Sequence, residues 1–266
     1  MEAAEYNRMG EALQTALRLN THPIAVKFCE RLEDVPENAV FPKKDLGKHI
    51  SFCQCTALTR FRGMTVAMTK EDHWCWNPLI ALGCVECVPG QPTFTEVIKI
   101  LGIKDPDKAA AFFTEFPRLP LDKYKAVVTT PLTKCTFEPD VAVIYSNTAQ
   151  MNVIIRAIKG MTGECLKSFF DGIDSCVYAT IVPLLSGEYQ LTFPDPGDRE
   201  RARAGDDEVI LSVPAAKLPE LAEQFKTPRF GMTYSNDLLE LPLEYPLPHF
   251  YAKLFDMWGL ESTPSK

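Results

Sequence analysis

The chain alternates hydrophobic and polar residues in patterns typical of both helices and strands. Apolar residues recur at helical spacing in segments 5–19 and 148–159, which predicts two amphipathic helices. Short apolar runs predict buried strands. The predicted strands are 23–28, 64–69, 126–130, 141–145, 190–193 and 209–213, and further helices are predicted at 51–62, 93–101, 106–116 and 214–225. These elements alternate without strict order, so we expect an α+β (mixed α/β) fold, with a mixed sheet packed with helices.

The remaining segments lack a clear period. Residues 31–47 and 195–207 are predicted to be loops, the second of them exposed, and residues 70–91 a functional loop around a short helix. Residues 176–185 are predicted to form a buried helix or strand. The proline-rich segment 241–249 is expected to wrap the surface.

A loose internal repeat divides the chain into two halves. Ser51-Phe52-Cys53, with a glycine and a strand pattern downstream, resembles Ser175-Cys176 and the residues that follow it. A predicted strand precedes each unit. We therefore expect an N-terminal half, 1–125, with the cysteine-rich segment 53–87, and a C-terminal half, 126–266, that carries Cys176. A chance similarity between two apolar helices within one compact domain is the alternative.

Composition excludes several classes of protein. With 46% hydrophobic and 24% charged residues, the chain is neither disordered nor fibrous. Its 28 basic and 35 acidic residues give a net charge of −7, which argues against nucleic acid as the main partner. The run 176–185 is too short to span a bilayer, so no membrane insertion is expected. Because the first residues also lack a basic stretch leading into an apolar one, we expect a cytoplasmic protein.

Cysteine is the unusual residue, with nine copies, five of them between residues 53 and 87. Disulfides rarely persist in a reducing cytoplasm, so this local density indicates metal or redox chemistry. Cys53 and Cys176 each follow a Ser or Asp cap candidate at a predicted helix start, where free backbone N–H groups stabilise a thiolate. Cys75 lies in a segment whose two indoles can shield a cofactor from water. The expected cofactor-binding residues are Cys53, Cys75, Cys176, His73, Trp74 and Trp76.

Other cysteines are weaker candidates. Cys84 and Cys87 form a CxxC pair before a Pro-Gly turn, which can direct both sulfurs toward one metal. Cys55 points away from Cys53 on a regular helix, so it is a ligand only where the backbone is irregular, and otherwise a core residue. The spacing matches neither ferredoxins nor zinc ribbons. The candidate metal ligands are Cys53, Cys55, Cys75, Cys84, Cys87 and Cys176, whereas Cys29, Cys135 and Cys165 are expected to be buried apolar residues.

Several motifs occur in an order found in a known family. They are the strand 23–28, Phe52-Cys53-Gln54, Arg62-Gly63, His73-Trp74-Cys75, residues 139–143, Ser175-Cys176 and residues 207–214. Over roughly residues 20 to 225 the chain resembles the prokaryotic family called domain of unknown function 169. The resemblance implies no particular activity. It implies cysteines at positions 53, 75 and 176, and it makes the Cys84–Cys87 pair an addition in this chain.

The leading expectation is an iron–sulfur protein of anaerobic or redox metabolism that binds a 4Fe-4S cluster and acts on a small-molecule substrate or a redox partner protein. As an enzyme it would be an oxidoreductase or a lyase. The alternatives are a zinc-stabilised binding protein without catalysis and a haem or other tetrapyrrole protein, in which His73 or a cysteine is the axial ligand. A homo-oligomer is compatible with each of these.

Overall fold

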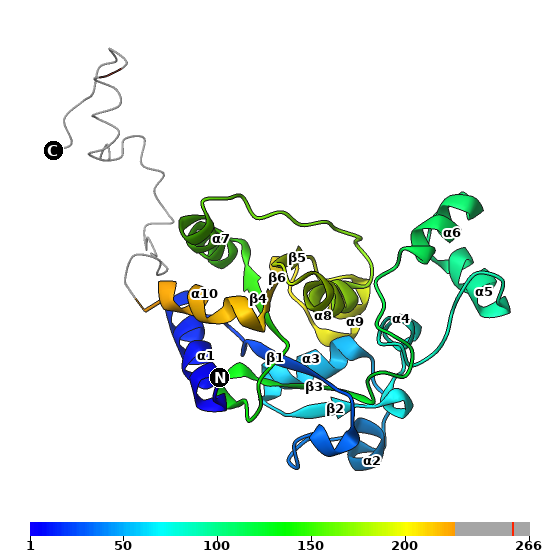
Figure 1. Cartoon of the computed structure of the whole chain (residues 1–266), viewed down its shortest axis with the longest axis horizontal. Coiled ribbons are helices and arrows are strands. Elements are labelled where there is room, and N and C mark those ends of the chain that lie inside the picture. Colours follow the sequence, from blue (N-terminus) through cyan, green and yellow to red (C-terminus); the bar gives the residue numbers. More distant parts are fainter. Residues whose placement is uncertain (227–256, 258–266) are drawn as a thin grey trace. The chain divides into compact units, whose positions relative to one another are not determined.

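The structure, a computed structural model, describes residues 1–226 and residue 257, and residues 1–226 lie within one compact unit. The predicted surface segment 241–249 falls outside the described residues. A six-stranded sheet with the order β2-β3-β1-β4-β6-β5 forms the centre of this unit (Figure 1). The strands are β1 (Ile24–Cys29), β2 (Val66–Met68), β3 (Ala126–Pro131), β4 (Val141–Asn147), β5 (Gln190–Thr192) and β6 (Glu208–Pro214).

Helices and short 3-10 turns connect the strands. The α-helices are α1 (Ala3–Leu17), α2 (Pro42–Leu46), α3 (Phe52–Arg62), α4 (Trp76–Ala81), α5 (Pro92–Ile100), α6 (Pro106–Thr114), α7 (Thr148–Thr162), α8 (Ser175–Ser186), α9 (Pro196–Ala202) and α10 (Leu218–Gln224). The 3-10 turns are η1 (Leu32–Asp34), η2 (Lys70–Asp72), η3 (Leu132–Lys134) and η4 (Ala215–Lys217). The α+β class predicted from the sequence is confirmed.

The sheet is buried on both faces, because alternate residues of each central strand enter different cores. In β4, Val143 and Tyr145 face one core, which α3 and α8 cover, whereas Ala142 and Ile144 face the other. Helices α1, α7 and α10 pack together over that second face (Figure 1). This two-sided burial explains why the central strands read as continuous apolar runs rather than as alternating ones.

The topology of the sheet follows the internal repeat. In each half a central strand precedes a long helix, which leads to an edge strand, and the chain then returns to the middle strand: β1-α3-β2-β3 in the first half and β4-α8-β5-β6 in the second, where α7 lies between β4 and α8. The first half of the sheet therefore includes β3 and extends past residue 125 to residue 131. Both middle strands end in proline, at Pro131 and Pro214, and each is followed by a 3-10 turn. Both helices end at a left-handed glycine, Gly63 or Gly187, each with a φ of 66°. Positions in α3 and α8 can therefore be compared directly.

Some local predictions were wrong. The ladders between the named strands are all antiparallel, and in the described part parallel pairing is limited to two isolated bridges, so the mixed sheet was too general a description. Segment 31–47 contains α2, and segment 195–207 contains α9 rather than an exposed loop. Within residues 1–226, no helix is both long and apolar enough to cross a membrane.

Candidate functional site

Cys53 lies in the first turn of α3, where the helix is capped by Ser51. The Ser51 hydroxyl accepts a hydrogen bond from the Gln54 amide, and the Gln54 side chain accepts one from the Ser51 amide at 2.9 Å. This capping box satisfies two of the free amides and fixes the start of the helix. The buried Cys53 sulfur lies 3.0 Å from the Ser51 hydroxyl, as the second residue of the helix.

Cys176 occupies the same position in α8. Asp174 is the N-cap, Ser175 the first helical residue and Cys176 the second. Asp174 adopts a left-handed conformation with a φ of 57°, which is uncommon outside glycine, although Asp tolerates it better than most residues. The two cysteines of the repeat therefore stand at equivalent positive ends of two helix dipoles.

Cys75 completes a group with these two. It is the N-cap residue of α4, and α4 packs against α8. The charges of Cys53 and Cys75 both contribute to raising the pKa of Cys176, and the charge of Cys75 contributes to raising that of Cys53. Three thiols from separate segments of the chain therefore lie within electrostatic range of one another. We call Cys53, Cys75 and Cys176 the thiol triad.

Aspartates from the second half surround the triad. Ser175 donates hydrogen bonds to Asp195, from its amide and its hydroxyl, at 2.9 Å each, and its hydroxyl also contacts Asp198. Asp195 in turn caps α9 by accepting from the Asp198 amide at 2.8 Å. Because a serine hydroxyl carries one proton, one of its two carboxyl contacts requires a proton on the carboxyl group. Burial raises the pKa of Asp198 to about 6, in line with this requirement.

Burial also raises the pKa of Asp174, to about 8, with further contributions from the charges of Asp171 and Asp195. The three thiols behave in the same way. Desolvation raises the pKa of Cys53 to about 12 and is the largest cause of the raised pKa values of Cys75 and Cys176. Without a cation, the thiols are therefore protonated at neutral pH, and any metal that binds them must displace protons.

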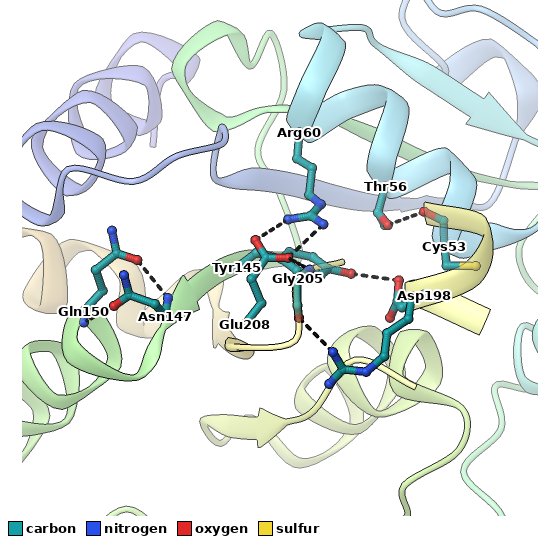
Figure 2. Close-up of polar contacts among 10 residues, drawn as sticks. Cys53, Thr56, Arg60, Tyr145, Asn147, Gln150, Asp198, Gly205 and Glu208 are labelled. Atoms are coloured by element: carbon teal, nitrogen blue, oxygen red, sulfur yellow. Dashed lines mark hydrogen bonds and ion pairs between the residues drawn. The ribbon is translucent and has the colours of Figure 1, made fainter. Parts of the chain in front are cut away.

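A buried arginine of α3, Arg60, contacts the polar residues next to this site (Figure 2). Arg60 of α3, whose side chain is 0% exposed, donates two hydrogen bonds to Glu208 of β6, at 2.7 and 3.0 Å. Its guanidinium group also lies 3.9 Å from the ring centre of Tyr145, whose hydroxyl donates to Asp198 at 3.3 Å. This chain of contacts joins the first half of the repeat to the aspartates of the second half.

The other residues of the segment 73–76, which reads His-Trp-Cys-Trp, lie in different surroundings from one another. His73 is buried, neither of its ring nitrogens has a hydrogen-bond partner, and burial lowers its pKa to about 4. Trp74 is 72% exposed and lies beside the ring of His49. Trp76 packs toward Phe113 of α6, at 6.3 Å between ring centres. The two indoles point in different directions and do not enclose one site.

The other candidate cysteines are separate from the triad sulfurs or point away from them. Cys55 is fully buried, with its sulfur 3.2 Å from the Thr129 hydroxyl of β3, so it lies against the sheet. Cys84 lies among Lys70, Glu71, Asp122 and Lys125, and the backbone carbonyl of Cys87 accepts from Arg118 at 2.7 Å. Cys29 and Cys135 are core residues as expected, whereas Cys165 is exposed, contrary to the expectation of burial.

The sequence pattern marks the polar residues before Cys176 only as helix-cap candidates, and it does not identify the other polar residues near the triad. These are Arg60, Tyr145, Asp195 and Asp198. Segment 195–207 looked solvated because acidic and basic residues alternate in it, yet Asp198 is 0% exposed. A usable signal was the run Asp195-Pro196-Gly197-Asp198, since an aspartate directly before a proline is typical of a helix start.

Among the described residues, no three His, Cys, Asp or Glu side chains are grouped in a way that would hold a single metal ion. No curated protein and no solved structure matches the chain. A family model described as "Uncharacterised ArCR", domain of unknown function 169, matches residues 12–224. Because this match covers well over half of the 266 residues, the chain belongs to that family.

Proposed function

We propose that the thiol triad binds an iron–sulfur cluster of the 4Fe-4S type. On this proposal the protein is a cytoplasmic redox protein or a cluster-dependent enzyme of anaerobic metabolism that acts on a small molecule. The proposal is supported by the placement of Cys53, Cys75 and Cys176 at the starts of three helices, α3, α4 and α8, of which α4 packs against α8. The three thiols lie within electrostatic range of one another, and Cys55 lies within the same range of Cys53 but contacts Thr129 of the sheet.

The local structure favours thiolate ligation at two of the three positions. Cys53 and Cys176 are the second residues of α3 and α8, where the helix dipole stabilises negative charge. The aspartates beside them attract a positive centre in their deprotonated forms. Desolvation and the mutual repulsion of these groups disfavour their charged forms until a cation neutralises them.

A cluster fits the triad better than a single zinc ion does. Each thiolate of a four-iron cluster binds a different iron, so the sulfurs stand further apart than ligands that share one ion. The described residues contain no set of three side chains grouped closely enough for a single ion. A chain of 266 residues also builds a sizeable core without a metal staple, which removes the main structural need for zinc.

Haem is supported less well. A buried histidine with two unpartnered ring nitrogens, His73, is a suitable axial ligand by chemistry. However, a large cavity of about 680 Å³ between α3 and α9 is lined by no His, Cys or Met side chain. The cavity and the ligand therefore do not coincide.

A bound cluster with three thiolates would supply one open iron as a Lewis acid, whereas a fourth ligand would leave electron transfer as its role. The residues of the chain have separate tasks around it. Asp174 holds a proton near neutral pH, since burial raises its pKa to about 8, whereas Asp198, whose pKa burial raises to about 6, exchanges its proton in slightly acidic solution. Ser175 fixes the positions of Asp195 and Asp198 through its hydrogen bonds.

The test is anaerobic purification of the full chain, reconstitution with ferrous iron and sulfide, and measurement of the absorption spectrum, iron and acid-labile sulfide. We expect a brown protein that contains both. The Cys75→Ala variant should lose most of its iron, because two thiolates are too few to retain the cluster. Cys135→Ala is the matched control, since Cys135 lies in the core on the other side of the sheet, and it should keep its iron. A colourless protein, or full iron content in Cys75→Ala, would reject the proposal.

A further inference from the structure

We propose that the hollow between α3 and α9 is a binding site for a small organic anion with an apolar body and an oxyanion head group, either a carboxylate or a phosphate. The hollow has a volume of about 680 Å³, which lies within the range of small-molecule sites. It is formed by one face of α3, the end of α9 and the segment after α2.

The interior of the hollow is apolar. Ile50, Leu58 and Phe61 line it, together with Leu46 at the end of α2. Phe61 is 48% exposed and Leu46 is 44% exposed, so two large apolar side chains that line the hollow face solvent. Contiguous exposed apolar surface of this kind is typical of a binding site.

The rim of the hollow is positively charged. Four of the lining residues are basic and none is acidic; the basic ones are Lys48, Arg62, Arg201 and Arg203. Within residues 1–226, none of these four forms an ion pair with a carboxylate. In a chain with a net charge of −7, four uncompensated cations around one apolar hollow give it a local potential that attracts an anion.

The backbone at the rim carries strain. Arg203 is the C-cap of α9 and has a φ of 55°, a left-handed conformation that glycine adopts most easily at this position. This conformation is energetically unfavourable for a residue other than glycine, and such residues cluster at functional sites. Here the strained residue is one of the four that line the hollow.

The hollow lies near the thiol triad, although no triad cysteine lines it. Arg201 lines the hollow, and its positive charge lowers the pKa of Cys75 and so favours the thiolate. An anion held by Arg201 therefore lies on the side of the hollow that faces the proposed cluster. The role of that anion as the substrate rests on the proposed function, whereas its binding to the hollow does not.

Isothermal titration calorimetry with 2-naphthoate, 1-naphthyl phosphate and the uncharged 2-naphthalenemethanol tests the inference on the full chain. We expect one site, with the uncharged compound binding about tenfold more weakly and the affinity for the anions falling as salt is raised. The stronger of the two anions identifies the head group. Equal binding of all three compounds, or no binding of either anion, would overturn the inference.

Variants connect the binding to the rim. The double change Arg201→Gln with Arg203→Gln should weaken anion binding by roughly tenfold. The double change Arg156→Gln with Lys159→Gln removes the same charge from exposed positions of α7 and should leave binding unchanged. Arg203→Gly should weaken binding without lowering the melting temperature, because it also relieves the backbone strain. Equal weakening in the α7 control would show that only net charge matters and would refute a specific site.

The two proposals fail separately. The titration is run on the protein both free of iron and reconstituted with iron and sulfide. Anion binding without any cluster supports the hollow and leaves only its link to the cluster unsupported. A cluster without anion binding supports the triad and rejects the hollow.

Discussion

The buried pair of Arg60 and Glu208 should be one of the main links between the two halves of the fold. Arg60 belongs to the first half and Glu208 to the second, and the two side chains form two hydrogen bonds. The Arg60→Met change keeps the apolar stem but removes the charge, and it leaves the Glu208 carboxylate with only the hydrogen bond from the Gly205 amide. Removing one member of a buried pair costs about 3–5 kcal/mol in stability.

Three features of the structure refine this magnitude. The Glu208 side chain keeps 17% of its exposure, so water partly solvates the orphaned carboxylate. The Nε of Arg60 has no hydrogen-bond partner, so one unfavourable group disappears with the arginine. The loss of the stacking between the guanidinium group and Tyr145 increases the destabilisation. We therefore expect a loss of about 3 kcal/mol and a melting temperature roughly 6–12 °C lower.

Urea denaturation of both proteins, followed by circular dichroism, measures this loss. Lys99→Met is the control, because Lys99 pairs with Glu96 on the exposed surface of α5 and such pairs contribute less than about 1 kcal/mol. Adding Glu208→Leu to Arg60→Met should restore part of the stability, since the orphaned charge is then removed. A free energy of unfolding for Arg60→Met within about 1 kcal/mol of the wild type would refute the reasoning.

Two further predictions concern pH and backbone conformation. Because burial raises the pKa of Asp174 to about 8, its protonated form stabilises the metal-free protein below the unfolded pKa of about 4, and this contribution is lost as the pH rises to about 8. Asp174→Asn should flatten the decline in the free energy of unfolding over this pH range, and an unchanged slope in urea titrations would contradict the assignment. Gly83→Ala should cost about 3 kcal/mol or more, because φ is +73° and a Cβ would lie 2.5 Å from the Pro120 carbonyl oxygen. Gly102→Ala, with the same φ and no atom within 4 Å of the added Cβ, should cost only about 1 kcal/mol, and equal losses would contradict the steric argument.

Most of the regular elements could be predicted from local patterns. The apolar period of segment 148–159 identifies α7, and Ser51 marks the start of α3, where it caps the helix. Segment 141–145 corresponds to β4, which extends two residues further. These predictions succeed because the burial of one face of a helix, or of both faces of a strand, determines which neighbouring positions along the chain are apolar.

The surroundings of the thiol triad could not be predicted in this way. Asp198 is buried because Ser175 and Tyr145, from other elements, supply its partners, and neither contact leaves a trace in the residues next to Asp198. Segment 176–185, predicted to be a buried helix or strand, lies in α8, a helix that contains Pro183. The repeat was more informative than any single pattern, because it led to the equivalent positions of Cys53 and Cys176.

The central claim is that one cluster lies between Cys53, Cys75 and Cys176. The most direct measurement is an anomalous difference map at the iron absorption edge, from crystals of the full chain grown without oxygen after reconstitution. We predict iron peaks within bonding distance of these three sulfurs and none at Cys84 or Cys87. An iron peak at the Cys84–Cys87 pair, or no peak between the three triad sulfurs, would contradict it.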